Sequence, residues 1–217
     1  FSLDLFYKSF KDYIQGGRFN TDVTNNGVTQ TVQVSGPANG KGAKIQGFEV
    51  AYNRFFDFLP KPLNGLGFQT NFTYLKNKGV PNANLNTFFG NASTTSAPAL
   101  NTGTLEGLSK YAYNVVGLYE LPNFPVSFRL AYNWRSKYLV TAIPCCNQLP
   151  TWQKAAGWLD GSIRYSVSNH FELSLEGSNL LSTKTQTLEQ LTDAKSPEKK
   201  IILVNNSWFR QDRRITF

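Results

Sequence analysis

The feature of this chain that most constrains its fold is a long segment, 126–140, in which apolar and polar residues alternate. The apolar register consists of Val126, Phe128, Leu130, Tyr132 and Trp134. The polar register consists of Ser127, Arg129, Ala131, Asn133, Arg135 and Lys137. Side chains on a β-strand alternate between its two faces, so the segment has one oily face and one charged face. Strands of soluble proteins usually have about 5–6 residues, whereas a tilted membrane-spanning strand needs about 9–11. The segment therefore predicts a wall strand of a transmembrane β-barrel.

The same alternation recurs along the chain, at 46–56, 111–121, 159–167 and 171–180. Each such segment of about ten residues is a weak signal alone, but several together are typical of a membrane barrel. We predict an all-β, antiparallel fold with eight long strands, at 2–14, 40–56, 66–77, 107–121, 124–139, 157–167, 169–181 and 207–217.

The connections between these strands alternate in length. Short turns are expected at 59–65, 121–125 and 168–170, and long polar loops at 15–39, 78–106, 140–156 and 182–206. Outer-membrane barrels have short periplasmic turns and longer extracellular loops, so the chain is expected to start outward and finish inward. Weak alternation over 26–34 predicts a hairpin that extends beyond the membrane.

Composition narrows the class of protein. The 217 residues contain no apolar run of 18 or more, so no transmembrane helix is expected. The net charge is +8, but the basic residues are dispersed among carboxylates except at 195–200, so nucleic acid is not an expected partner. A soluble β-sandwich fits less well than a barrel, because sandwich strands are usually shorter.

Whether the eight strands close on themselves is left open by these patterns. They can form a small closed barrel or one arc of a larger wall. The chain has no methionine and opens within an expected strand, without the features of a signal peptide, which favours an arc of a longer protein. The charged residues expected on the inward register are Glu49, Arg129, Arg135, Lys137, Asp160, Arg164, Glu172 and Glu176.

Several motifs within about 44–181 resemble the C-terminal barrel of TonB-dependent receptors. The segments that carry the resemblance are Gly47–Tyr52, Phe55–Pro60, Leu63–Leu75, Leu108–Asn114, Ala131–Leu139, Leu159–Ser162 and Glu176–Leu181. They are most similar to the large subfamily linked to carbohydrate uptake. The resemblance implies a 22-stranded barrel closed by an N-terminal plug domain. Residues 1–217 are then the C-terminal portion of that barrel, with the plug and the N-terminal strands outside this chain. The ending at 213–217 departs from the pattern, since the last strand looks incomplete.

The resemblance also implies a function and a location. The expected function is active transport of a scarce solute across the outer membrane, where the protein lies as a multi-pass barrel. The solute is expected to be a carbohydrate or oligosaccharide, and second a ferric siderophore. Expected partners are outer-membrane lipid and lipopolysaccharide, the rest of the receptor, the TonB–ExbB–ExbD complex acting through the plug, and the small-molecule solute. The alternatives are a passive porin or structural barrel without energy coupling, and a soluble lectin-like sandwich.

Sugars are bound by aromatic faces together with amide and charged groups. The ligand-binding candidates in or beside the long loops are Phe88, Phe89, Asn91, Trp152, Gln153 and Trp208. Arg135 and Lys137 are further candidates, on the lumen side near the outer rim. Each of these residues can instead belong to an aromatic girdle or to the lumen wall.

No catalytic, metal or cofactor site is expected. His170 is the only histidine and has no ligating partner nearby in the sequence. Glu172 and Glu176 are four residues apart on one strand face, which suits a lumen wall better than a proton-sharing pair. The adjacent Cys145 and Cys146 lie in an expected extracellular loop. They can form a vicinal disulfide, bridge to other cysteines or stay free, and the vicinal disulfide is the favoured option.

Overall fold

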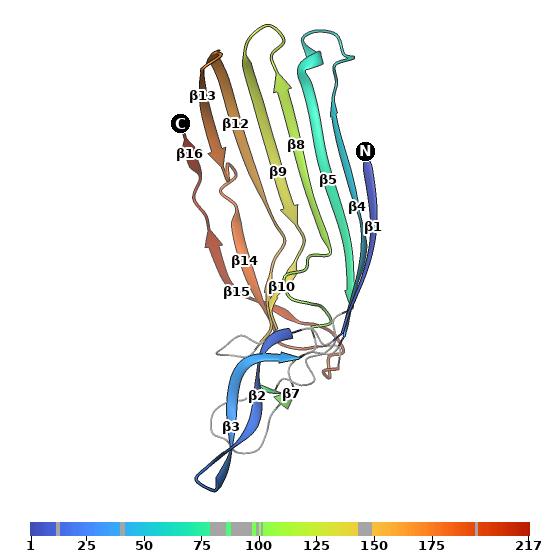
Figure 1. Cartoon of the computed structure of the whole chain (residues 1–217), viewed down its shortest axis with the longest axis vertical. Coiled ribbons are helices and arrows are strands. Elements are labelled where there is room, and N and C mark those ends of the chain that lie inside the picture. The colour runs from blue at the N-terminus through green and yellow to red at the C-terminus, as the bar shows by residue number, and fades with distance from the viewer. Residues whose placement is uncertain are drawn as a thin grey trace.

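Eight antiparallel strands form the largest sheet of the computed structural model, which describes residues 1–11, 14–39, 42–78, 86–87, 97–98, 100, 102–142, 149–193 and 195–217. In spatial order these strands are β1 (Ser2–Phe10), β4 (Ala43–Phe55), β5 (Leu66–Lys78), β8 (Tyr111–Glu120), β9 (Val126–Arg135), β12 (Ala156–Ser168), β13 (Phe171–Ser178) and β16 (Arg214–Thr216). They run side by side along the long axis of the molecule (Figure 1). Each strand's neighbour is the next predicted wall strand, so the predicted all-β antiparallel wall is confirmed.

The two ends of this sheet differ, as the loop lengths predicted. Short connections join β4 to β5, β8 to β9 and β12 to β13 at one end, which we call the turn end (top of Figure 1). The first of these connections contains a single 3-10 turn, η1 (Leu63–Gly65). The opposite end, the loop end, carries the long connections. Among the described residues, no helix is long and apolar enough to cross a membrane.

The predicted hairpin in the first long loop is confirmed and is longer than expected. Strands β2 (Ile14–Asn25) and β3 (Val28–Asn39) pair over their whole length and project from the loop end (Figure 1). Asn26 and Gly27 join them with φ of 50° and 78°. Two residues with positive φ are what a tight type I′ turn requires, and Asn-Gly is its preferred sequence. A two-residue pairing of β6 (Asn86–Thr87) with β7 (Ala97–Pro98) lies within the second long connection.

The prediction that 140–156 and 182–206 are loops is wrong in part. A second, four-stranded sheet consists of β10 (Tyr138–Thr141), β11 (Thr151–Gln153), β14 (Lys184–Gln190) and β15 (Leu203–Arg210). It continues the wall beyond the loop end of β9, β12 and β13, and we call it the extension (Figure 1). Arg135 pairs with Ala156 and Tyr138 pairs with Gln153, so the register passes unchanged from the wall into the extension.

The extension escaped prediction because most of its residues are polar. A segment such as Lys184–Gln190 shows little hydrophobic alternation, so its sequence does not indicate a strand. Pairing with the neighbouring strands holds it in an extended conformation. The predicted last strand at 207–217 is also divided. Its first part belongs to β15 in the extension, and only Arg214–Thr216 pair with β13 in the wall.

The two faces of the wall have opposite chemistry. On the apolar face Leu130 is 51% exposed and Phe128 is 38% exposed. On the polar face, Arg164 and Glu176 form an ion pair at 3.7 Å. Large apolar side chains are normally buried in a soluble protein, so this exposed oily face requires an apolar environment.

Aromatic pairs mark both borders of the apolar face. At the turn end Tyr119 stacks on Phe128 with ring centroids 6.4 Å apart, and toward the loop end Tyr74 lies 5.5 Å from Tyr111. The eight residue-to-residue steps from Tyr111 to Tyr119 span about 27 Å along β8, before any strand tilt. Membrane barrels carry an apolar band about 25 Å tall between two aromatic girdles, and this spacing fits such a band.

Asn179 forms the joint between β13 in the wall and β14 in the extension. Its φ is 52°, a left-handed conformation that Asn tolerates better than most residues. Its N–H donates to Asp160 Oδ1 at 2.8 Å, its Nδ2 donates to the Gln211 carbonyl at 2.8 Å, and its Oδ1 accepts from the Thr183 N–H at 2.9 Å. One buried side chain thus ties together the segments that pass from wall to extension.

We predict that Asn179→Ala lowers the free energy of unfolding by roughly 2–5 kcal/mol. The left-handed conformation costs a Cβ-bearing residue about 1–2 kcal/mol, and each lost hydrogen bond costs about 0.5–1.5 kcal/mol. Urea unfolding of the receptor in lipid vesicles measures the change. Asn179→Gly is the matched control and should lose less, because glycine keeps the positive φ. Equal losses for the two variants would show that the backbone conformation at this joint is unimportant.

Candidate functional site

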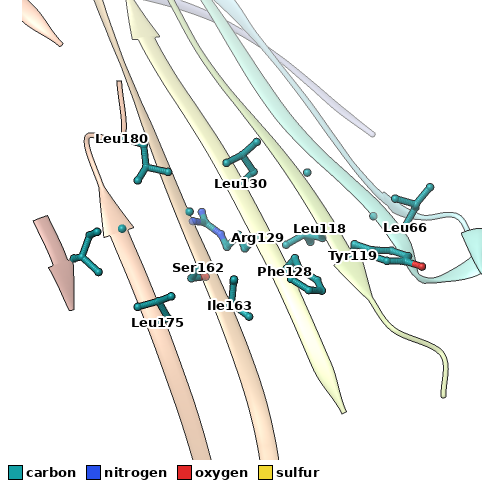
Figure 2. Close-up of a pocket in the computed structure, with 15 residues that line it drawn as sticks. Leu66, Leu118, Tyr119, Phe128, Arg129, Leu130, Ser162, Ile163, Leu175 and Leu180 are labelled. Carbon is teal, nitrogen blue, oxygen red and sulfur yellow. The ribbon is translucent and has the colours of Figure 1, made fainter. Parts of the chain in front are cut away.

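An apolar hollow lies on the apolar face, near the turn end. It has a volume of about 550 Å³ and is lined by side chains such as Phe128, Leu130, Ile163 and Leu175 (Figure 2). A row of glycines, Gly117, Gly161 and Gly177, deepens it. Leu180 packs over Gly177, where its side chain lies 2.7 Å from the place a Cβ would occupy. Such an oily surface offers few polar groups to a hydrophilic solute, which favours the other face for the functional site.

A second hollow, of about 560 Å³, lies on the polar face and extends across the sheet from β1 to β9. Its floor is a ladder of three asparagines, in which Asn114 is the cross-strand partner of both Asn71 and Asn133. Asn114 Nδ2 donates to Asn71 Oδ1 at 2.6 Å. Gln69 and Asn53 add further carboxamides to the lining. Carboxamides both donate and accept hydrogen bonds, which matches the hydroxyl groups of a sugar or the polar surface of another protein segment.

A small hydrophobic core stabilises the extension. Leu139 is fully buried, and it packs with Ala142 and Trp152, which are 7% and 8% exposed. Leu188 and Leu203 pack against this cluster. The indole Nε1 of Trp152 donates to Oε1 of Gln190, which is also fully buried, at 3.0 Å. Trp152, a predicted ligand-binding residue, therefore also has a structural role.

Arg135, another predicted ligand-binding residue, holds the segment that precedes β8. Its Nε donates to Ser109 Oγ at 2.9 Å and its Nη2 donates to the Gly107 carbonyl at 2.8 Å. The guanidinium group also lies 3.7 Å from the centre of the Tyr138 ring. These contacts hold the segment that leads into β8 against β9. They also use two N–H donors of the Arg135 guanidinium group that would otherwise be available to a ligand.

Three other predicted ligand-binding residues lie in the extension. Lys137 Nζ is 5.0 Å from the Trp152 ring, and Gln153 Nε2 donates to the Gln186 carbonyl at 3.1 Å. Trp208 on β15 is 57% exposed. The structure thus gathers Lys137, Trp152 and Gln153 around β11 and places Trp208 two strands away. Phe88, Phe89, Asn91, Cys145 and Cys146 lie outside the described residues. The role of all these residues in ligand binding stays a prediction.

A third hollow, of about 430 Å³, lies beside Trp208 in the extension. Its other lining side chains are those of Lys154, Lys184, Gln186 and Asn205, together with Ala155. Sequence reasoning missed these residues because it assigned 140–156 and 182–206 to loops. The available signal was the period of two in Lys184, Gln186 and Leu188, which places their side chains on one face of a strand.

The titratable residues His170, Glu172 and Glu176 have few side-chain contacts. His170 lies exposed in the turn between β12 and β13, where its N–H donates to Ser168 Oγ at 3.3 Å. Ser166 Oγ donates to Glu172 Oε2 at 3.4 Å, and Glu176 pairs with Arg164. Among the residues that the structure describes, no group of three or more His, Cys, Asp or Glu side chains is placed to hold a metal ion.

Comparison with known proteins gave one match. The family model described as TonB dependent receptor-like, beta-barrel matches residues 1–180. The matched range runs from β1 through β13 and ends at Leu180, which packs over the glycine row. Comparisons with curated proteins and with solved structures gave no match.

We predict that Gln190→Met lowers the free energy of unfolding of the receptor by about 1–3 kcal/mol, because it leaves the buried Trp152 N–H without this acceptor. Thermal unfolding in detergent, followed by tryptophan fluorescence, measures the change. Adding Trp152→Phe removes the stranded donor, so the double variant should lose less than the sum of the two single changes. An unchanged unfolding temperature for Gln190→Met would contradict the role given to this hydrogen bond.

Proposed function

The chain belongs to the TonB-dependent receptor family, and on that premise we propose that it is part of an energised importer of a carbohydrate or oligosaccharide. Proteins of this family are outer-membrane β-barrels that carry out TonB-dependent transport and are not enzymes. In such a barrel the apolar face of the wall contacts lipid and the polar face lines the lumen.

The architecture we propose is a 22-stranded barrel with a plug, in which residues 1–217 form the last eight strands. Within the described residues β1 and β16 each pair with one wall strand only. Backbone groups at such edges have to be paired inside a membrane, which supports further strands on both sides. The turn end then faces the periplasm, and the extension and the β2–β3 hairpin face the outside.

The observation that carries the choice of solute is the chemistry of the lumen-facing hollow. Asn71, Asn114 and Asn133 provide a row of carboxamides there, and Trp208 offers an exposed ring beyond them at the loop end. Amides for hydroxyl groups and a ring for stacking are what a sugar requires. A ferric siderophore is the second candidate, favoured by the cationic side chains of the extension.

The proposed ligand-binding residues are not equally well supported by the structure. Trp208 is the best supported candidate because its ring is more than half exposed, whereas Arg135 and Trp152 also hold the fold together. Phe88, Phe89 and Asn91 are proposed to contact the solute from the second long connection. Lys137 and Gln153 are proposed to line its entry, and Cys145 and Cys146 to form a vicinal disulfide nearby.

Energy for transport is proposed to reach the receptor from the inner membrane. The TonB–ExbB–ExbD complex pulls on the plug, and the plug then opens a path along the polar face of this wall. The polar lumen wall, with its Arg164–Glu176 ion pair and asparagine ladder, supplies the surface against which the plug and the solute move.

The experiment that tests this proposal measures uptake in a strain that lacks the receptor gene, complemented with the full-length gene. We expect uptake of labelled oligosaccharides to require the gene and to fall at least tenfold when the tonB gene is deleted or a protonophore is added. Uptake that needs the receptor gene but not TonB would identify a passive porin. Uptake of ferric chelates alone, with expression repressed by iron, would overturn the carbohydrate assignment.

A further inference from the structure

The hollow beside Trp208 is lined by side chains of β14, β15 and the segment that follows β11, and two of them, Lys154 and Lys184, are cationic. Gln186 on β14 is the cross-strand partner of Trp208 on β15, and Lys184 is the partner of Arg210 in the same way. The Lys154 N–H, which follows β11, donates to the Gln186 carbonyl at 2.8 Å. Directly paired residues share a face, so these side chains lie on one face of the extension. Strands β14 and β15 lie next to each other in Figure 1.

This face is continuous with the lumen side of the barrel. The register from β9 and β12 into β10 and β11 is unbroken, so alternation puts Lys154 on the same face as Ala156 and Asp160. Asp160 belongs to the polar face, together with its neighbour on that face, Ser162. The cationic group therefore faces the mouth of the barrel, where a solute enters, and not the lipid.

Among the residues that the structure describes, no carboxylate pairs with either lysine of the hollow. The Lys154 ammonium group is 3.4 Å from Gln186 Oε1, and the Lys184 ammonium group is 4.8 Å from the centre of the Trp208 ring. In the described part of the chain, neither lysine is within ion-pair distance of an acidic side chain. Glu189 is odd-numbered on β14, so its side chain projects from the opposite face to Lys184 and Gln186.

More positive charge surrounds the hollow. Arg210 shares the face of Lys184, and its Nε donates to the neutral Ser182 Oγ at 3.0 Å. Lys137 directly precedes β10, and its ammonium group lies over the ring of Trp152, which is on the same face of β11 as Lys154 by alternation. Cations gathered at a mouth attract an oppositely charged solute and raise its local concentration.

We propose that Lys154 and Lys184, with Gln186, Asn205 and Trp208, form a subsite for a carboxylate or sulfate group carried on the transported solute. The lysines supply the charge, the two carboxamides supply hydrogen bonds, and the indole ring supplies a flat apolar surface beside the anion. Two solutes share this chemistry: an acidic oligosaccharide and a carboxylate-bearing ferric chelate. The inference rests on the proposed function for the direction of transport, but the binding step can be measured separately.

The test is equilibrium binding to the full-length receptor purified in detergent at fixed ionic strength. The probes are galacturonate trisaccharide, its methyl-esterified form, which has the same rings without charge, and ferric citrate. We expect at least one anionic probe to bind, and the methyl ester to bind at least tenfold more weakly than the free trisaccharide if the solute is a sugar. Binding of ferric citrate alone identifies a chelate as the solute class and keeps the subsite.

Variants locate the binding. Lys154→Gln/Lys184→Gln should weaken the anionic probe at least tenfold, whereas Lys154→Arg/Lys184→Arg should retain binding and show that the fold is intact. Lys199→Gln/Lys200→Gln is the matched control, because it removes the same charge from an exposed segment outside the hollow. Binding of neither anionic probe at millimolar concentration, or equal binding by the Lys→Gln variant and the wild type, would overturn the subsite.

Binding and transport fail in distinguishable ways. Lysine-dependent binding without TonB-dependent uptake of the bound probe would keep the subsite and overturn the proposed import. If uptake depends on TonB but the Lys→Gln variant binds the probe as tightly as the wild type, the proposed import stands and the proposed subsite is wrong.

Discussion

The structure depends on the need to pair every backbone N–H and C=O group within a membrane. Hydrocarbon offers no hydrogen-bonding partner, and each unpaired group costs several kcal/mol, so strands can cross only as parts of a continuous hydrogen-bonded wall. The antiparallel ladder from β1 to β16 meets this need for every strand between its two edges. Once the backbone is paired in this way, the side chains are free to differ between the two faces, and the wall separates lipid from lumen.

The extension continues this ladder into water, where the constraint on side chains is relaxed. There the strands carry polar residues on both faces and are held by cross-strand hydrogen bonds and by the small cluster around Leu139 and Trp152. The joint at Asn179 lets β13 continue as β14 after a local change of direction. The extension places Lys154, Lys184 and Trp208 around one hollow at the loop end of the wall.

Much of the wall could be predicted from sequence, and the reason is physical. Lipid on one side and water on the other impose a strict period of two on segments such as 126–135, and that period is readable in one chain. The extension has no such contrast between its faces, so the sequence pattern predicts loops for β11, β14 and the first half of β15. The same limitation applies to the candidate site. The sequence indicates Trp208 as a ligand-binding candidate because it is aromatic, but it does not indicate Lys154, Lys184 or Gln186. These three residues become candidates only because strand pairing places them around one hollow. The roles of Arg135 and Trp152 in holding the fold were likewise invisible, because their partners Gly107 and Gln190 lie far away in the sequence.

The central claim is that one face of this wall lies in lipid and the other lines a polar lumen. Spin labels placed one at a time at residues 126–135 of the receptor in lipid vesicles, with Cys145 and Cys146 replaced by serine, test it most directly. The relaxation of each label by oxygen, which concentrates in lipid, is compared with its relaxation by a water-soluble nickel chelate. The account predicts strict alternation, with Phe128, Leu130 and Tyr132 exposed to oxygen and Arg129, Ala131 and Asn133 shielded from it. A profile without a period of two, or equal access of the nickel chelate to both registers, would contradict the account.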